Sequence, residues 1–268
     1  MRQLILSIVA LSVCAISVPV KAVTLNEDFS GGIQPDRWDI FRNDAADAPW
    51  TITAPDPNGW LQTSKVADSD PLKMYVECLA VIQSQFQLIG DFSVTVDFNL
   101  VDFPIPNSVG WNEAILRVVP PDSPATIFEV LRFTSSDTAQ NQWVEGFLHY
   151  PTGDFKKIGL TPDPTLQGSF SITRLGGTLS AWIDRGAGPV LLGSETSAQF
   201  EVPMSVQLLT TQVPTLTDVR PSTSLDVRFD NLSISADSIV PEPSTLILLC
   251  TGAVGLLAYA WRQRKQTA

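Results

Sequence analysis

The sequence contains very little cysteine and histidine, and this excludes several kinds of site. Its three cysteines are Cys14, Cys78 and Cys250, and only Cys78 lies between the two apolar ends of the chain. That stretch therefore has no cysteine-based zinc site and no internal disulfide. We expect Cys78 to be a small buried side chain. His149 is the only histidine, and there is no Gly-x-Ser-x-Gly motif, so a Ser-His-Asp triad has no support.

Basic residues are also scarce in the central part of the chain. Residues 23–240 contain 27 acidic and 12 basic side chains, a formal charge of −15. This balance argues against nucleic acid as a partner and against binding an anionic polymer by charge attraction alone. It suits an exported protein that has to stay soluble, and also a protein that holds divalent cations through oxygen ligands.

No stretch of twelve or more residues shows a convincing helical stripe, whereas alternation of apolar and polar residues is widespread. In residues 92–100, for example, every second side chain is apolar, which is typical of a half-buried antiparallel strand. Residues 169–184 contain two such runs that meet at Gly176-Gly177, which predicts a hairpin. The other strands that we expect lie at residues 50–54, 59–64, 113–119, 126–134, 142–150, 189–195, 204–211 and 224–235. The sequence therefore predicts an all-β fold, a two-sheet antiparallel β-sandwich.

Two apolar segments flank this predicted sandwich. The first combines Arg2, an almost continuously apolar run from Leu4 to Val18, and small residues at the cleavage positions before and at Ala22. This is the pattern of a secretory signal peptide over residues 1–22. We assign residues 23–236 to the β-sandwich and residues 237–268 to a separate C-terminal segment.

The C-terminal segment contains a predicted membrane helix. Ser244–Trp261 is 18 residues long and has no charge, which is just long enough to cross a bilayer. Three basic residues follow it and should hold the carboxyl end in the cytoplasm: Arg262, Arg264 and Lys265.

A tripeptide, Pro241-Glu242-Pro243, precedes this helix. Together with the apolar helix and the basic end, it resembles the PEP-CTERM sorting signal of Gram-negative bacteria. A plain membrane anchor would explain the helix and the basic end but not the tripeptide. The resemblance implies an inner-membrane intermediate, processing by the membrane protease exosortase, and delivery to the cell surface or extracellular matrix. Such proteins accompany exopolysaccharide and biofilm production. The prolines would keep the cleavage segment extended.

The central part has a second resemblance. Residues 25–40 ("LNEDFSGGIQPDRWDI") look like the opening of concanavalin A-like lectin/glucanase domains. Residues 90–98, 172–184 and 227–235 fall where that family has its middle, late and closing strands. The resemblance implies a jelly roll with a concave sheet, on which relatives bind or cleave sugars.

The glucanases of that family carry Glu-x-Asp-x-Glu, or a variant one residue longer, on a single strand, and this spacing is not found here. The nearest pattern is Asp226-x-Arg228-x-Asp230. An arginine between two acids keeps both ionised, which is unsuitable for a general acid. We therefore expect a charge-balanced outer face of the last strand and no catalytic residues.

The same resemblance implies a structural calcium ion near the two ends of the domain. Asp230 matches the family's final-strand aspartate, and Glu27 lies in the matching opening segment. Carboxylate and carbonyl oxygens suit Ca²⁺. The alternative is that Asp230-Asn231 forms a turn through side-chain hydrogen bonds to the backbone.

Tryptophan supplies the candidate ligand site. Of the six tryptophans in the exported part, we expect Trp111 and Trp143 to be exposed together with His149, as a platform for sugar rings. The leading hypothesis is a non-catalytic surface or matrix protein that binds extracellular polysaccharide. The alternatives are a structural or adhesive envelope protein without sugar binding, and a glycoside hydrolase with non-standard acids.

Overall fold

The computed structural model describes residues 22–43, 49–67, 78–106, 110–121, 126–136, 141–214 and 223–241. Within these ranges the regular structure consists of fifteen β-strands and one short 3₁₀ turn, η1 (Ala198–Phe200). The all-β prediction is confirmed. The predicted signal peptide (apart from Ala22), the predicted transmembrane helix and its basic flank lie outside the described residues. Among the residues that the structure describes, no helix has the length and apolar character that a membrane crossing requires.

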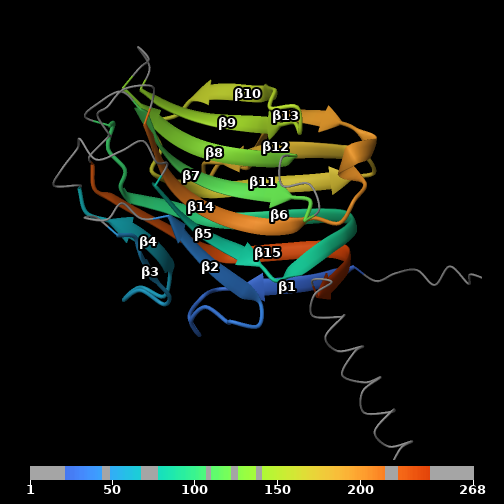
Figure 1. The fold of residues 1–268 in the computed structure, drawn as a ribbon, viewed down its shortest axis with the longest axis horizontal. Helices are drawn as coiled ribbons and strands as arrows, with labels where there is room; N and C mark the ends of the chain where they lie inside the picture. Colours follow the sequence, from blue (N-terminus) through green and yellow to red (C-terminus); the bar gives the residue numbers. More distant parts are fainter. Residues whose placement is uncertain are drawn as a thin grey trace, which may run out of the picture.

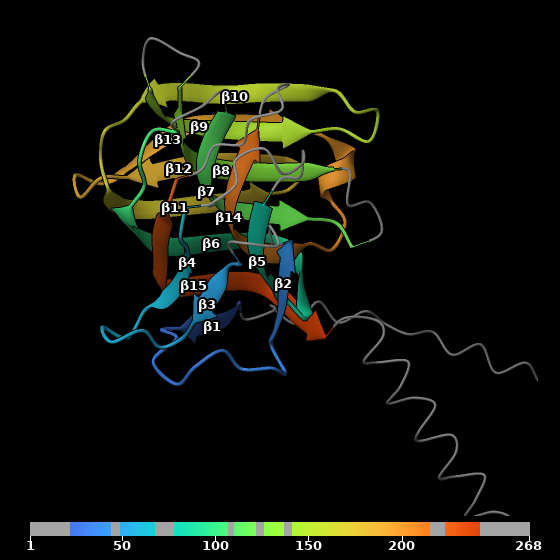
Figure 2. The ribbon, with the colours of Figure 1, turned by 60° about the vertical axis from the view of Figure 1, so that its left-hand side comes forward.

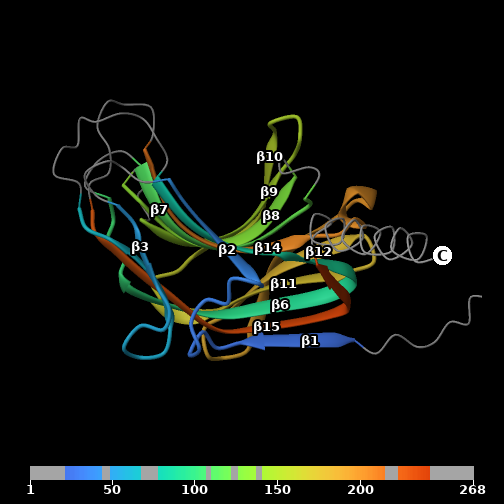
Figure 3. The ribbon, with the colours of Figure 1, turned by 60° about the horizontal axis from the view of Figure 1, so that its bottom comes forward.

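The strands form two antiparallel sheets that stack as a sandwich (Figures 1 and 2). In sheet A the strand order is β13 (Pro189–Thr196), β12 (Thr178–Asp184), β11 (Gln167–Leu175), β6 (Phe86–Asp102), β15 (Leu225–Pro241), β4 (Leu61–Lys65) and β3 (Thr51–Thr53), and β1 (Val23–Glu27) also pairs with β15. In sheet B the order is β10 (Phe155–Pro162), β9 (Gln142–His149), β8 (Ile127–Ser135), β7 (Gly110–Val119), β14 (Ser205–Pro214), β5 (Cys78–Ser84) and β2 (Trp38–Asn43). In Figure 3 the strands of sheet B lie above β6, β15 and β1.

The main core lies between the two sheets and follows the predicted alternation. On β6, Phe92, Val94, Val96, Phe98 and Leu100 are all buried. Because successive strand residues face opposite sides, this register leaves the intervening polar residues on the outer face of sheet A. Aromatic pairs in the core include the stacked rings of Phe98 and Phe170, with centroids 4.2 Å apart.

Two local predictions are also confirmed. Cys78 is buried, with 3% of its surface exposed. The β11–β12 hairpin turns at Gly176 and Gly177, between the paired residues Leu175 and Thr178. Gly176 has a φ of +56°, a conformation that costs glycine little because it has no Cβ.

Strand β15 spans the full length of sheet A beside β6. Their pairing runs from Asp226 opposite Asp102 to Pro241 opposite Phe86. The strand therefore continues past residue 236, where the sequence analysis placed the end of the sandwich. Near this end, Val23 at the start of β1 pairs with Ala236. The start of β1 and the end of β15 thus lie at the same end of sheet A.

Candidate functional site

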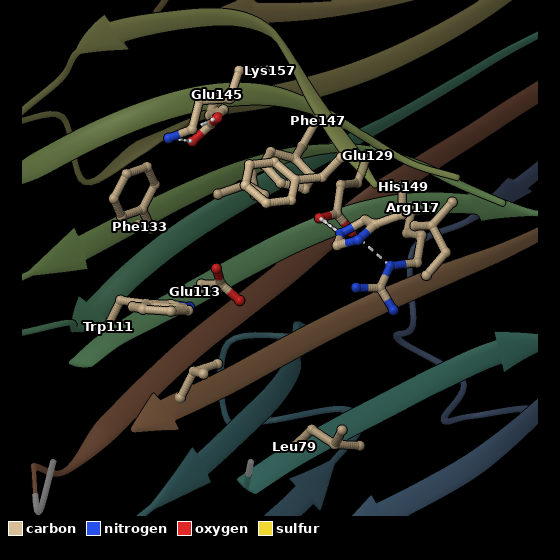
Figure 4. Close-up of a pocket in the computed structure, with 14 residues that line it drawn as sticks. Leu79, Trp111, Glu113, Arg117, Glu129, Phe133, Glu145, Phe147, His149 and Lys157 are labelled. Atoms are coloured by element: carbon tan, nitrogen blue, oxygen red, sulfur yellow. Dashed lines mark hydrogen bonds and ion pairs between the residues drawn. The ribbon is translucent and has the colours of Figure 1, made fainter. Parts of the chain in front are cut away.

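A cleft of about 610 Å³ lies on the face of sheet B that points away from sheet A (Figure 4). Side chains from β5, β7, β8, β9, β10 and β14 line it. Strand alternation explains how they reach this face: on β9, Val144 and Leu148 point into the main core, while Glu145, Phe147 and His149 point into the cleft. We refer to this feature as the sheet B cleft.

The floor of the sheet B cleft is apolar. A second hydrophobic cluster, separate from the main core, consists of Val81, Ile115, Leu131 and Leu209. These four side chains come from four strands of sheet B, and they are buried beneath the partly exposed Leu79, Phe133 and Phe147. Such a floor, combined with a few polar groups, is typical of sites for small molecules and sugars.

Three glutamates line the cleft, one from each of three adjacent strands. Glu113 lies on β7, Glu129 on β8 and Glu145 on β9. Each is sixteen residues after the one before it in the sequence. The register places Glu129 opposite Phe147, and Leu131 opposite Glu145. Glu129 and Glu145 are therefore diagonal neighbours across two strands, an arrangement that differs from carboxylates placed on one strand.

Glu129 is held as a carboxylate by the side chains of Arg117 and His149. Its Oε2 accepts a hydrogen bond of 2.7 Å from Nε of Arg117, and its Oε1 lies 3.5 Å from Nε2 of His149. Burial would raise the pKa of Glu129, but the Arg117 guanidinium and the His149 imidazole outweigh burial, so the pKa lies below its ordinary value. Both oxygens of this buried carboxylate thus face a partner.

Glu145 has the opposite electrostatic character. Burial is the largest influence and raises its pKa, and the nearby Glu129 charge adds to this, although Lys157 acts against it. Nζ of Lys157 is 3.3 Å from Oε1 and 3.5 Å from Oε2 of Glu145. The Oε1 contact is within ion-pair range but lacks hydrogen-bond geometry, so this buried oxygen has no hydrogen-bond partner. Lys157 is half exposed, which weakens its influence.

Glu113 lies at the other end of the cleft. Oγ1 of Thr211 donates a 2.8 Å hydrogen bond to its Oε2. Trp111 lies two residues earlier on the same face of β7, and Phe133 of the neighbouring strand β8 is directly opposite Glu113. This end of the cleft therefore combines a carboxylate with aromatic rings, as Figure 4 shows.

The structure places the three predicted ligand-binding residues on the cleft face of sheet B. Trp111 and His149 line the cleft, at opposite ends. Trp143 lies beside it, where its ring stacks with Phe133 at a centroid distance of 6.5 Å. Phe147 and Phe155 were not predicted from the sequence: the ring centroid of Phe147 lies 4.6 Å from that of His149 and 5.3 Å from that of Phe155.

The missed glutamates and phenylalanines had a signal in the sequence. In residues 127–133 and 143–149, every second residue carries a charge, an aromatic ring or a large apolar side chain on what proves to be the cleft face. Alternation alone could not show which of the two faces would be hollow.

The predicted metal residues lie on sheet A, away from the cleft. Oδ1 of Asp230 is buried and has no hydrogen-bond partner. Burial raises the pKa of Asp230, and the Asp28, Asp97 and Asp56 carboxylates raise it further. A buried oxygen without a donor, among other acids, fits a bound cation.

Glu27 fits a cation less directly. Its Oε1 accepts the backbone N–H of Phe29 at 3.3 Å, and its Oε2 is 3.7 Å from NH1 of Arg37. Among the residues described, no three histidine, cysteine, aspartate or glutamate side chains are grouped as metal ligands. A calcium ion here would therefore need backbone carbonyls beside Asp230.

The Asp226-x-Arg228-x-Asp230 pattern forms ion pairs on sheet A. NH2 of Arg228 is 3.2 Å from Asp226, and its NH1 is 2.8 Å from Asp56. Hydrogen bonding to Asp226 raises the pKa of Arg228. Arg228 thus pairs with Asp226 and Asp56 in the opposite sheet from the cleft. The pKa of Asp230 is instead raised by burial, so the expected effect of the arginine on both acids of the pattern is not seen at Asp230.

Residues 240–265 match the model of the PEP-CTERM protein-sorting motif. No curated protein sequence matches the chain.

Solved structures share the fold. The LamA protein of Zobellia galactanivorans, crystallised with laminaritriose and laminaritetraose, is 14% identical with a TM-score of 0.55, covering 80% of this chain and 98% of that one. The Bacillus licheniformis beta-glucanase is 12% identical with a TM-score of 0.54, covering 80% and 97%. A glycoside hydrolase family 16 endo-glucanase from Bacteroides ovatus is 13% identical with a TM-score of 0.54, covering 81% and 99%. The chain thus combines the jelly-roll fold of family 16 glucanases with a PEP-CTERM motif, which indicates export and exosortase-dependent sorting to the cell surface.

Proposed function

We propose that this protein is an exosortase-processed surface or matrix protein of a Gram-negative bacterium that binds extracellular polysaccharide in the sheet B cleft without cleaving it. The observation that carries the proposal is the cleft itself: an apolar floor, aromatic side chains at both ends, and a few polar groups between them. Sugar rings present apolar C–H faces to aromatic rings and hydroxyl groups to carboxylates. Relatives in fold include proteins whose structures contain oligosaccharides.

The state of Glu129 supports binding over catalysis. A glycoside hydrolase needs one carboxylate that can act as nucleophile or base and one carboxylic acid. One oxygen of Glu129 faces Arg117 and the other faces His149, and its side chain is only 4% exposed. The carboxylate is therefore oriented toward the protein's own side chains.

A second candidate function, glycoside hydrolysis, is favoured by one specific observation. The pKa values of Glu129 and Glu145 are shifted in opposite directions, and both residues line the same cleft. Such a divergence is how a pair of carboxyl groups takes the roles of base and acid. Release of reducing sugar from a polysaccharide by the mature protein, lost in the Glu145→Gln variant, would establish hydrolysis. If the mature protein releases no reducing sugar, binding without cleavage is the supported function.

A third reading is a structural or adhesive envelope protein with no affinity for sugar. A glycan array probed with the mature protein separates it from the leading proposal. Binding of one polysaccharide class is expected. An array on which every glycan stays unbound would overturn the proposed function.

A structural calcium ion is a separate proposal. Asp230 would hold it through the buried Oδ1 that lacks a donor. The ion would offset the mutual repulsion of the neighbouring acids and tie the last strand to the opening segment, where Glu27 lies.

A further inference from the structure

The PEP-CTERM motif begins inside the sandwich. The matched residues start at Val240, whereas β15 continues to Pro241. Val240 pairs with Gln87 of β6, and Pro241 pairs with Phe86. The first proline of the motif is therefore part of β15 and is still paired in sheet A. No spacer separates the folded domain from the sorting motif.

The strand against which this end pairs is fixed on the core. Leu88 is fully buried, and its backbone N–H and C=O bond to Met204 at 2.8 and 3.0 Å. Phe86 is 6% exposed and packs edge-on against Trp38, with ring centroids 5.5 Å apart.

The preceding residues of β15 are held as well. Ser238 and Ile239 pair with Ile89 and Leu88. Oδ2 of Asp237 accepts the backbone N–H of Asp91 at 2.9 Å. Opening the end of β15 would thus expose backbone groups that are now paired and would disturb a buried segment.

Cleavage requires a free segment of chain. A protease breaks the C–N bond of a peptide: the carbonyl carbon passes to water or to an amine acceptor, and the nitrogen leaves as the new amino terminus of the tail. The residues around that bond have to enter the active site as an extended strand. Residues paired within a sheet reach such a site only through local unfolding, which lowers the cleavage rate.

We propose that the sandwich itself sets the limit of processing, so that exosortase cuts on the carboxyl side of Pro241 and the mature protein retains β15 complete. Pro241 suits this boundary position. It has no N–H to donate to a further ladder bond, and its fixed φ keeps the chain extended where it leaves the sheet.

The mass of the mature protein tests this directly. We expect the C-terminal peptide of the surface-extracted protein to contain Pro241. A mature chain that ends at Val240 or earlier would overturn the proposal. A surface protein that still contains Trp261 would also overturn it, because no processing would have occurred. None of these results depends on whether the cleft binds a glycan.

An insertion provides a second test. Gly-Ser-Gly-Ser placed between Val240 and Pro241 leaves the tripeptide intact but moves it away from the sheet. We expect faster conversion of precursor in a pulse-chase experiment, and a mature mass that increases by the four inserted residues. The same insertion between Gly176 and Gly177, in a distant turn, serves as the control and should leave conversion unchanged. Equal or slower conversion of the first variant, or a mature mass without the insert, would contradict the proposal.

Discussion

Nζ of Lys157 lies 3.3 Å from Oε1 of Glu145, and yet the pKa of Glu145 is raised. Burial outweighs the ion pair because the lysine is half exposed and its charge is screened by solvent. The folded state therefore binds a proton on Glu145 more tightly than the unfolded chain does. This contribution to stability is fully present below the ordinary pKa of 4.5 and is lost as the pH rises through the raised pKa of the folded protein.

Replacing Glu145 by Gln should therefore stabilise the protein at neutral pH. We expect Glu145→Gln to raise the unfolding temperature at pH 7 by about 2 to 4 °C, which corresponds to about 1 kcal/mol in a domain of this size. The difference from wild type should shrink below pH 4.5, where the wild-type residue is protonated as well. Thermal melts from pH 4 to pH 8 measure this. A variant that is less stable than wild type at pH 7 would show that the ion pair with Lys157 dominates.

Glu129→Gln should have the opposite effect. The lowered pKa of Glu129 means that its contribution to stability is present above the ordinary pKa of 4.5 and is lost as the pH falls through the lower pKa of the folded protein. Removing the carboxylate leaves Arg117 without its 2.7 Å acceptor. We expect the free energy of unfolding at pH 7 to fall by about 2 kcal/mol. Urea unfolding at pH 7 and pH 3 measures the loss, which should be smaller at pH 3.

Glu195→Gln is a matched control for this change. Glu195 pairs with Lys156 at 2.5 Å, but Lys156 is half exposed and solvent screens its charge, so the loss should be much smaller than that of Glu129→Gln. Equal losses in the two variants would contradict the role assigned to the buried Glu129 pair.

The fold could be predicted from the sequence where one face of a strand is buried and the other is wet. Residues 92–100 alternate cleanly because sheet A has a solvated outer face. Strand β5 (Cys78–Ser84) was not predicted, and the reason is physical. It faces the main core on one side and the apolar floor of the cleft on the other, so Ala80, Val81 and Ile82 are all buried and the alternation is lost.

The candidate site was harder to predict because it depends on register. Trp111, Trp143 and His149 were predicted from residue type, but their spacing along the chain does not show that β7, β8 and β9 lie side by side. The same pairing brings Glu129 and Glu145 together, although they are sixteen residues apart. A search for carboxylates on one strand could not find a pair divided between two strands.

Trp143→Ala tests the aromatic side of the cleft. Removing the indole ring should weaken retention on a polysaccharide column by about 2-fold to 10-fold, because an aromatic contact contributes about 0.5 to 1.5 kcal/mol beyond its buried area. Elution of the mature protein from columns that carry the glycan identified by the array would measure the change. Trp182→Ala is the matched control, since that partly exposed indole lies on sheet A and donates to Thr173. Equal weakening by both variants would place the glycan site elsewhere.

Removal of divalent cations tests the proposed calcium site. A chelator should lower the unfolding temperature of the mature protein, and added Ca²⁺ should restore it, because an ion that binds only the folded state stabilises that state by mass action. Asp230→Asn should abolish the response, since the replacement removes the charge of the buried oxygen that lacks a donor. Asp226→Asn is the matched control, because Asp226 is on the same strand but already pairs with Arg228 at 3.2 Å. A melting curve that does not change with chelator would show that the acids around Asp230 are stable without a cation.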